Sequence, residues 1–255
     1  MGRPSVTKIF CGDALDIVPE LPYPDLIYID PPFFTQRDFE SFDDRWASLQ
    51  TYTDWLTEYC AVGWDALNPG GNFLIHLDWH AVHAMKVRLD HCFGGNFVNE
   101  IIWSYNSGGA SKRRLSRKHD NILWYTKPGA EYTFNVIREP YATPDAADRP
   151  GFHPDGRMLT DVWQIPFLST TAKERTGYPT QKPLALLERI ITIFSNEGDL
   201  VLDYFCGSGT TGVAAEKLAR RSILVDSNPE ATSIAQARLE MLKSETTPDA
   251  GVADA

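Results

Sequence analysis

The segment DLVLDYFCGSGTTG, residues 199–212, decides the fold of this 255-residue chain. A short apolar run ends in an acid, and a glycine-rich turn follows before a helix-forming stretch begins. Strand, glycine turn and helix in this order are typical of α/β sheets that bind nucleotide-like ligands, because glycines let the backbone approach the ligand closely. The segment therefore predicts an α/β fold with a ligand at the end of this strand.

Strand and helix patterns alternate on both sides of this segment. Short apolar runs between turn residues are expected to be buried strands at residues 8–11, 25–30, 72–78, 200–205 and 222–226. Amphipathic stretches of helical length lie between them at residues 51–67, 79–91, 183–195, 210–220 and 229–243. Such alternation predicts a mostly parallel sheet with helices on both faces.

The composition limits the class of protein. Hydrophobic residues make up 43% of the chain and charged residues 23%, which is ordinary for a globular protein. No apolar run approaches the roughly 18 residues of a membrane span, and the first residues lack the apolar core of a secretory signal. Four scattered cysteines without CxxC spacing favour a reducing, intracellular compartment. The net charge of -10, taken over the whole chain, argues against a nucleic-acid partner.

The glycine turn fits two kinds of ligand. Gly207, Gly209 and Gly212 match the dinucleotide-binding spacing, and Asp226 ends the next strand pattern. A pyrophosphate needs N–H donors at the positive end of a helix, and the nearby carboxylate of Asp203 would repel it. An acid there suits a ligand with an amino group and a sulfonium, such as S-adenosylmethionine. An NAD-dependent oxidoreductase and a ligand-free structural turn stay as alternatives.

A second acid ends a strand pattern at Asp30-Pro31-Pro32-Phe33. Prolines fix φ and lack an N–H, so the turn is expected to be rigid, with carbonyls that accept hydrogen bonds. The Asp30 carboxylate and the Pro31 carbonyl can grip both N–H bonds of one amino group, while Phe33 lies over a planar ring. This arrangement would localise the lone pair of an exocyclic base amine and stabilise its developing positive charge. The alternative is a proline-stiffened surface turn.

Four motifs together resemble those of the amino-methylating DNA methyltransferases, adenine-N6 and cytosine-N4, in their β arrangement. They are Gly12-Asp13-Ala14-Leu15, Asp30-Pro31-Pro32-Phe33, Tyr178-Pro-Thr-Gln-Lys-Pro183 and Asp203-x-Phe205-Cys-Gly-Ser-Gly209-Thr-Thr. Their order is that of the β arrangement, and the likeness covers residues 8–238. The resemblance implies a Rossmann-like, S-adenosylmethionine-dependent methyltransferase fold. In that family the mixed sheet has seven strands and a reversed edge strand.

The resemblance also assigns roles to residues. Asp13 would contact the adenine amino group of the S-adenosylmethionine cofactor, and Asp226 its ribose. Thr180, Gln181 and Lys182 would lie near its carboxylate. The full set of expected cofactor-binding residues is Asp13, Ala14, Thr180, Gln181, Lys182, Asp203, Phe205, Gly207, Gly209, Thr210 and Asp226. The expected catalytic residues are Asp30, Pro31, Pro32 and Phe33, and no metal is expected.

The target base is expected to be adenine, with cytosine-N4 as the alternative. The fourth residue of the catalytic motif is more often Tyr in the family, and here it is Phe33, which keeps stacking but loses the hydroxyl. Asp30 at the first position favours adenine, because Ser is common there among cytosine-N4 enzymes. No cysteine follows a proline, which disfavours the thiolate chemistry of cytosine-C5 methylation.

The irregular middle of the chain carries a local positive charge. Between Trp103 and Lys127 there are six Lys or Arg residues and one acid, Asp120, after the glycine- and serine-rich residues 107–111. We expect a flexible loop whose cations neutralise phosphates of double-stranded DNA, although a solvated basic loop is the alternative. The expected DNA-binding residues are Lys112, Arg113, Arg114, Arg117 and Lys118. The target base must leave the stack to reach Asp30, so base flipping is implied.

A histidine-rich stretch resembles a metal site. His76, Asp78, His80 and His83 have ligand-like spacing for zinc or iron. The resemblance instead assigns this strand end to the target-base side of the pocket. We expect His76 and Asp78 to line the base pocket.

These assignments divide the chain into parts. Residues 1–103 form the catalytic half, residues 104–177 a target-recognition insertion, and residues 178–243 the cofactor-binding half of the same domain. Residues 244–255 are expected to be a disordered tail. A cytoplasmic, nucleoid-associated protein of a prokaryote or phage is expected. A homodimer and a cognate restriction endonuclease are compatible partners, and no membrane partner is expected. A non-catalytic DNA-binding protein on the same scaffold is a further alternative.

Overall fold

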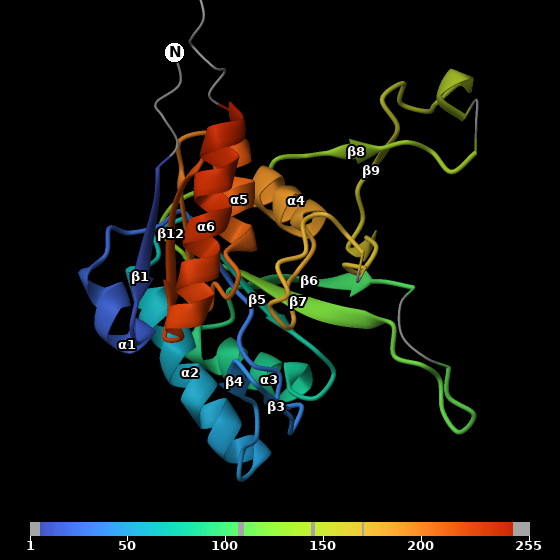
Figure 1. Cartoon of the computed structure of the whole chain (residues 1–255). Helices are drawn as coiled ribbons and strands as arrows, with labels where there is room; N and C mark the ends of the chain where they lie inside the picture. The colour runs from blue at the N-terminus through green and yellow to red at the C-terminus, as the bar shows by residue number, and fades with distance from the viewer. Residues whose placement is uncertain (1–5, 107–109, 144–145, 170, 247–255) are drawn as a thin grey trace, which may run out of the picture.

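An eight-stranded sheet organises the protein (Figure 1). The computed structural model describes residues 6–106, 110–143, 146–169 and 171–246. The strands of the sheet lie in the order β1-β12-β11-β2-β5-β7-β6-β10. Their bounds are β1 Thr7–Cys11, β12 Arg221–Asp226, β11 Leu200–Asp203, β2 Leu26–Ile29, β5 Asn72–Leu77, β7 His119–Thr126, β6 Phe97–Ser104 and β10 Val162–Gln164.

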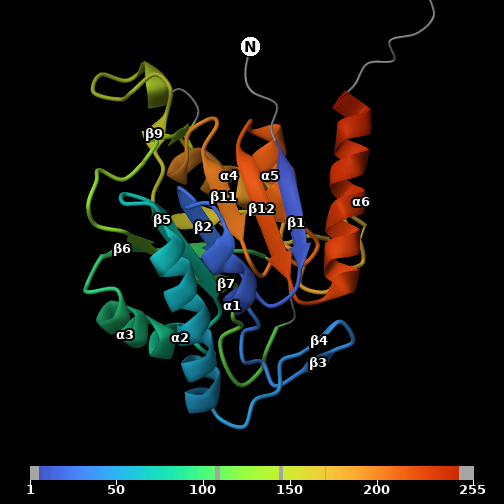
Figure 2. The ribbon, with the colours of Figure 1, turned by 90° about the vertical axis from the view of Figure 1, so that its left-hand side faces the viewer.

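Helices cover both faces of the sheet (Figure 2). The helices are α1 Ala14–Ile17, α2 Leu49–Ala66, α3 Val82–Cys92, α4 Leu184–Phe194, α5 Thr210–Lys217 and α6 Pro229–Thr246. Alternate residues of β2 enter opposite cores: Ile27 and Ile29 pack with α2 and α3, whereas Leu26 and Tyr28 pack with α4. A strand buried on both faces must be apolar at every position, which is why β2 has a continuous apolar sequence.

The predicted fold class is confirmed. Each of the ten predicted strands and helices overlaps an observed element of the same type, with bounds that differ by a few residues. The last helix, α6, continues to Thr246, so residues 244–246 are helical rather than part of a tail. Residues 247–255 lie outside the described residues.

The sheet differs from the expected one in its reversed strand. The sheet has eight strands rather than seven, and the antiparallel strand β7 lies between β5 and β6 instead of at the edge. β7 also falls within residues 104–177, so this region contributes a central strand as well as loops. Strand–helix alternation could not reveal β7, because β6 and β7 pair directly without a helix between them.

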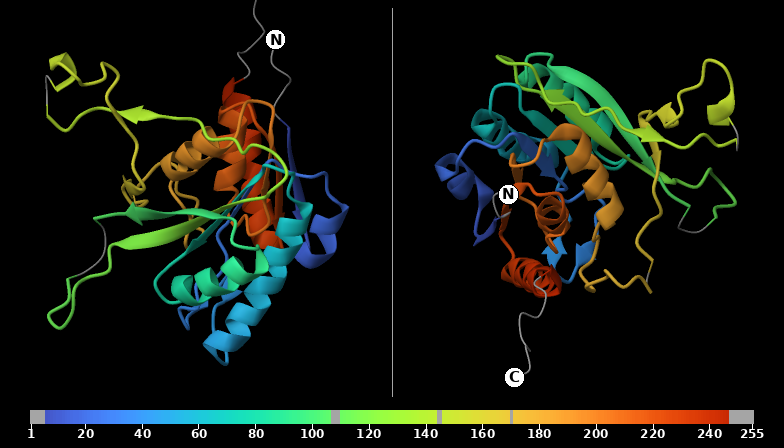
Figure 3. Two further views of the ribbon diagram at one scale, coloured as in Figure 1. Left: turned by 180° about the vertical axis from the view of Figure 1, so that it is seen from behind. Right: turned by 90° about the horizontal axis from the view of Figure 1, so that it is seen from above.

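Smaller elements lie outside the sheet. The hairpin of β3 Asp38–Phe39 and β4 Phe42–Asp43 precedes α2, and β8 Arg138–Glu139 pairs with β9 Arg157–Met158. Two short 3-10 helices span Val18–Glu20 and Ala146–Asp148. The segment that carries β8 and β9 projects from the body of the protein (Figure 3). In the part of the chain that the structure describes, no helix has the length and apolar surface needed to cross a membrane.

Two crossovers diverge at the centre of the sheet. β11 and β2 pair in parallel, through Val201 with Leu26 and Leu202 with Ile27. The chain leaves β11 toward β12 on one side, and it leaves β2 toward β5 on the other. Open α/β sheets bind ligands at such a point, beyond the carboxyl ends of the strands. Asp203 and Asp30 stand at these two strand ends.

The glycine turn after β11 requires glycine at one position for two reasons. Gly209 has φ +75°, in the left-handed region. A Cβ atom there would lie 2.5 Å from Cβ of Ala235 on α6 and 3.0 Å from its Cα. The turn is therefore held against α6 by backbone contact rather than by a side chain.

We predict that Gly209→Ala destabilises the protein more than Gly198→Ala. Gly198 has φ +84° but open space around it, so alanine there costs only the backbone strain of about 1–2 kcal/mol. Gly209→Ala adds the overlap with Ala235, which costs a further ~1–3 kcal/mol. Urea unfolding of both variants measures the difference in the free energy of unfolding. Equal losses would contradict the close approach.

Candidate active site

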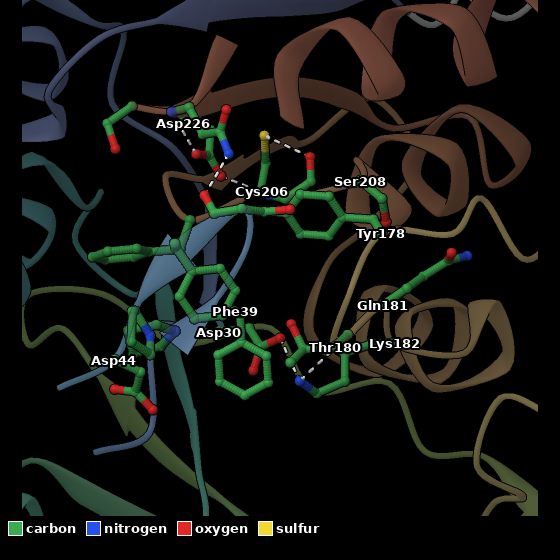
Figure 4. A pocket seen from close by; sticks show the side chains of 18 of the residues that line it. Asp30, Phe39, Asp44, Tyr178, Thr180, Gln181, Lys182, Cys206, Ser208 and Asp226 are labelled. Atoms are coloured by element: carbon green, nitrogen blue, oxygen red, sulfur yellow. Dashed lines mark hydrogen bonds and ion pairs between the residues drawn. The ribbon is translucent and has the colours of Figure 1, made fainter. Parts of the chain in front are cut away.

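A cavity of about 640 Å³ opens at the carboxyl ends of β2 and β11 (Figure 4). Its wall combines the turn after β2, the glycine turn after β11, the end of β12 and the segment before α4. The hairpin β3–β4 contributes one side. The predicted residues that line the cavity are Asp30, Pro31, Pro32, Phe33, Thr180, Gln181, Lys182, Asp203, Phe205, Gly207, Thr210 and Asp226. The structure therefore brings both strand-end acids and most of the predicted cofactor residues to one cavity.

The two oxygens of the Asp30 carboxylate differ in their partners. Lys182 Nζ donates to Asp30 Oδ2 at 2.5 Å, and it lies 4.9 Å from the centre of the Phe33 ring. Asp30 Oδ1 is buried, and within the described residues it accepts no hydrogen bond. A buried carboxylate oxygen without a donor is costly, and the imidazole of His76 lies 4.0 Å from this one. Lys182 was expected beside the cofactor carboxylate, and its ion pair with Asp30 was not anticipated.

The turn that carries Asp30 is fixed by two residues that the sequence patterns did not identify. The Tyr52 hydroxyl donates to the Pro32 carbonyl at 2.6 Å. Asp44 is buried, and its carboxylate accepts from the backbone N–H groups of Phe34 and Thr35 at 2.9 and 2.7 Å. Phe34 has φ +63°, so these bonds hold a backbone conformation that a phenylalanine rarely adopts. No local pattern separates Asp44 from its exposed neighbour Asp43.

His76 lies behind the Asp30 turn rather than in the wall of the cavity. Its ring is fully buried, its Nδ1 atom lies 2.8 Å from the Tyr28 hydroxyl, and Phe33 packs on it with ring centres 5.6 Å apart. His76 Nδ1 is 4.0 Å from Asp30 Oδ1, and His76 Nε2 is 3.4 Å from Asp120 Oδ2. His76 therefore supports both predicted catalytic side chains, Asp30 and Phe33, from behind.

Asp120 and Asp78 have partners of their own. Burial raises the pKa of Asp120, but His76 and the charge of Lys182 outweigh it, and the net shift is downward. Asp120 Oδ1 also accepts from the Tyr105 hydroxyl at 2.9 Å. Asp78 pairs with His80, whose Nδ1 lies 2.7 Å from Asp78 Oδ2, and it does not line the cavity. Across the described residues, no three His, Cys, Asp or Glu side chains gather as metal ligands.

Asp203 is a buried acid that lines the cavity. It is 2% exposed and accepts from the Thr211 hydroxyl at 2.5 Å and from the Phe205 N–H at 3.1 Å. Burial raises its pKa to about 7, although these hydrogen bonds oppose the shift. A cationic group in the cavity would favour the ionised form of Asp203.

Asp226 orders the glycine turn and lines the cavity. Its two carboxylate oxygens accept from the Gly207 N–H at 2.8 Å and the Asn228 N–H at 2.9 Å. Burial raises its pKa, against these two hydrogen bonds. An acid in this position can also accept hydrogen bonds from the hydroxyl groups of a ligand in the cavity.

Some predicted cofactor residues lie outside the cavity wall. Asp13 caps α1, accepting from the Leu15 N–H and the Tyr59 hydroxyl, both at 2.9 Å. Ala14 is buried in α1 behind it, and Gly209 lies against α6. Gln181 borders the cavity, but its amide binds the Thr176 N–H and the Glu174 carbonyl, and in Figure 4 it turns away from Asp30.

The basic loop lies between β6 and β7, outside the cavity. Lys112, Arg113 and Arg114 are exposed there, and Lys118 is half-buried. Arg117 is exposed, and its guanidinium lies 3.3 Å from the centre of the Trp79 ring. Residues 107–109, part of the predicted flexible segment, lie outside the described residues.

The chain matches known proteins over most of its length. The family model described as DNA methylase matches residues 24–237. The chain is 32% identical to the Type II methyltransferase M.HpaI of Haemophilus parainfluenzae, over 91% of this chain and 74% of the relative. It is 31% identical to the DNA adenine methyltransferase YhdJ of Escherichia coli K12, over 91% and 82%. The crystal structure of the M1.HpyAVI–SAM complex superimposes with a TM-score of 0.63 and 27% identity, covering 91% of this chain and 100% of that chain.

These similarities support S-adenosylmethionine as the cofactor, and the cavity is compatible with it. S-Adenosylmethionine carries an ammonium group, a sulfonium and two ribose hydroxyls. Two acids lie on the cavity wall: Asp203, which is buried beside the glycine turn, and Asp226, which is half-buried at the end of β12. The similarities give no support to the NAD-dependent oxidoreductase that the glycine spacing left open.

We predict that the affinity for S-adenosylmethionine falls as the pH is lowered from 7.5 to 6. The pKa of Asp203 is raised to about 7, so below that pH it carries a proton that an incoming ammonium group must displace. The dissociation constant measured by calorimetry should rise roughly fivefold to tenfold over this range. Asp203→Asn should bind weakly at both values and lose the dependence. Equal affinity of the unmodified protein at pH 6 and 7.5 would exclude this role.

Proposed function

We propose that this chain, which belongs to the family of amino-methylating DNA methyltransferases, methylates the exocyclic N6 amino group of adenine in double-stranded DNA. The observation that carries the proposal is the Asp30 carboxylate at the wall of the cavity, held through Oδ2 by Lys182. A base flipped out of the duplex would present its amino group to this carboxylate.

The residues around Asp30 suit an amine that is a poor nucleophile. The Asp30 carboxylate and the Pro31 carbonyl would each accept one N–H of the amino group. Two acceptors favour a pyramidal nitrogen and stabilise the positive charge that develops on it. Lys182 donates to Asp30 Oδ2, and this ion pair fixes the orientation of the carboxylate. Phe33, packed on His76, would stack on the base.

The cofactor would occupy the part of the cavity beside the glycine turn. When bound, it would supply a methyl group: the bond from the methyl group to sulfur breaks with its electron pair left on sulfur as a neutral thioether, the lone pair of the base nitrogen forms the new bond, and the nitrogen then loses a proton to solvent. Asp203 would bind the ammonium group, Asp226 the ribose, and Thr180 would lie near the carboxylate. Trp55 and Phe205 lie on the same wall, with ring centres 5.8 Å apart, and would pack on the cofactor.

Adenine is favoured over cytosine by two observations. Asp30 begins the catalytic motif, and the relative from Escherichia coli is named an adenine methyltransferase. Cytosine-N4 methylation is the second candidate, because Phe33 lacks the hydroxyl of the more common Tyr. Labelled S-adenosylmethionine, mixed-sequence duplex DNA and mass analysis of the digested nucleosides separate them. N6-methyladenine supports the proposal, and N4-methylcytosine overturns the base assignment.

We propose that residues 104–118 and 127–177 bind the DNA around the target. One of their exposed cations, Arg117, adjoins the carboxyl end of β5, because it stacks on Trp79, which follows that strand. Phosphate contacts position a protein on the duplex, whereas contacts with base edges specify the sequence. The basic loop would supply the phosphate contacts.

We predict that Asp30→Ala lowers the rate of methyl transfer by about 10²–10³-fold, the range seen when one preorganised charge-stabilising group is lost. Binding of S-adenosylmethionine should be retained, because the cofactor contacts lie beside the glycine turn. Asp54→Ala, which removes an exposed acid on α2, serves as the control and should keep the rate. Full activity of Asp30→Ala would overturn the proposal.

We predict that replacing both Arg113 and Arg114 by alanine weakens DNA binding and its dependence on salt. Each phosphate contact contributes about 0.9 to the slope of log K against log salt concentration, so the slope should fall by about two. Lys217→Ala, on α5, removes a positive charge that pairs with Glu188 and should leave the slope unchanged. Fluorescence anisotropy of labelled DNA at several salt concentrations measures the slope for each variant. An unchanged slope for the double variant would mean that these arginines contact no phosphate.

A further inference from the structure

The loop between β6 and β7 presents an apolar side chain among cations. Leu115 is 93% exposed, more than any other large hydrophobic residue in the described part of the chain. Its neighbours Arg113, Arg114 and Arg117 are also exposed. An isolated exposed leucine needs no explanation in general, but this one stands at the centre of the strongest positive cluster in an acidic protein.

The turn around Leu115 is braced on both sides. The Ser111 N–H donates to the Ser116 hydroxyl oxygen at 3.2 Å, and the Arg113 N–H donates to the Ser111 hydroxyl oxygen at 3.3 Å. Arg117 fixes the following residues by stacking on Trp79. Leu115 therefore projects from a short closed turn, and it belongs to none of the hydrophobic cores of the described residues.

The loop leads directly to the catalytic turn. Five residues after Leu115, Asp120 lies 3.4 Å from His76, which in turn lies 4.0 Å from Asp30. Five extended residues span at most about 18 Å. Figure 1 shows the loop extending beyond the ends of β6 and β7, away from the body of the protein. Leu115 is thus on a short arm anchored beside the site that receives the target base.

We infer that Leu115 enters the DNA base stack and occupies the space that the target base leaves. Removal of a base exposes the apolar faces of its neighbours, and an apolar side chain between them restores part of the lost contact. The flanking arginines would hold the phosphates on either side of the gap. This inference rests on the proposed methylation of a flipped base. It adds a residue that makes flipping favourable without touching the base that reacts.

Sequencing of modified bases first locates the DNA site that the protein methylates. The test then compares two duplexes that carry this site. In one duplex the target base is paired, and in the other it faces an abasic position, so that its extraction costs less. Leu115→Ala should slow methylation of the paired duplex by about tenfold or more, because the gap is left unfilled. On the abasic duplex the same variant should come within about threefold of the unmodified protein. Leu115→Met, which keeps an apolar side chain, should retain most of the activity on both.

A control variant separates insertion of Leu115 into the base stack from a general effect of losing an exposed apolar side chain. Met241→Ala removes another exposed apolar side chain, 63% exposed on α6 at the opposite end of the sheet, and should methylate both duplexes at the normal rate. Normal activity of Leu115→Ala on the paired duplex would overturn the inference, as would an equal loss on both duplexes. If the unmodified protein methylates no DNA, the proposed function fails instead.

Discussion

The parallel pairing of β2 with β11 is the constraint on which the site depends. The pairing aligns two strand ends that each carry an acid, and the crossovers leave these strands in opposite directions. No helix can cover the point where they diverge, so a cavity opens there. Asp30 and Asp203 therefore line one cavity from adjacent strands. In the proposed reaction, the distance between the methyl acceptor and the cofactor would be set by the spacing of neighbouring strands rather than by flexible loops.

The turn after β2, which carries Asp30, gains its rigidity from buried polar contacts. Two prolines restrict the backbone φ angles of the turn. Hydrogen bonds from its backbone to Asp44 and from the Tyr52 hydroxyl to its backbone then fix its position. Lys182 holds one oxygen of Asp30, and His76 lies 4.0 Å from the other. The carboxylate is therefore fixed before any ligand arrives, which is the condition for the electrostatic catalysis proposed above.

Local patterns in the sequence predicted much of this structure, and long-range contacts account for the rest. The strands that end in Asp30, Asp203 and Asp226 were predictable, because burial and turn chemistry are encoded within a few residues. β7 was not, since it pairs with β6 without an intervening helix. The ion pair of Lys182 with Asp30 joins residues 152 positions apart. Asp13 caps α1, a contact that competes with its predicted role of binding the adenine amino group of the cofactor. Neither contact follows from spacing along the chain.

The order of strands in the sheet has a consequence for synthesis of the chain. Asp25, beside β2, accepts from the Leu200 N–H, which lies 175 positions later. When the ribosome has made the turn after β2 and the basic loop, the edge of β2 that pairs with β11 is still unpaired. β11, α5 and β12 must emerge before the centre of the sheet closes, and pairing over such long separations is slow because the loop entropy is lost first. Nascent chains thus expose an unpaired apolar strand edge for most of translation. We therefore expect chaperones to bind the nascent chain, since the domain cannot fold before its last strands are made.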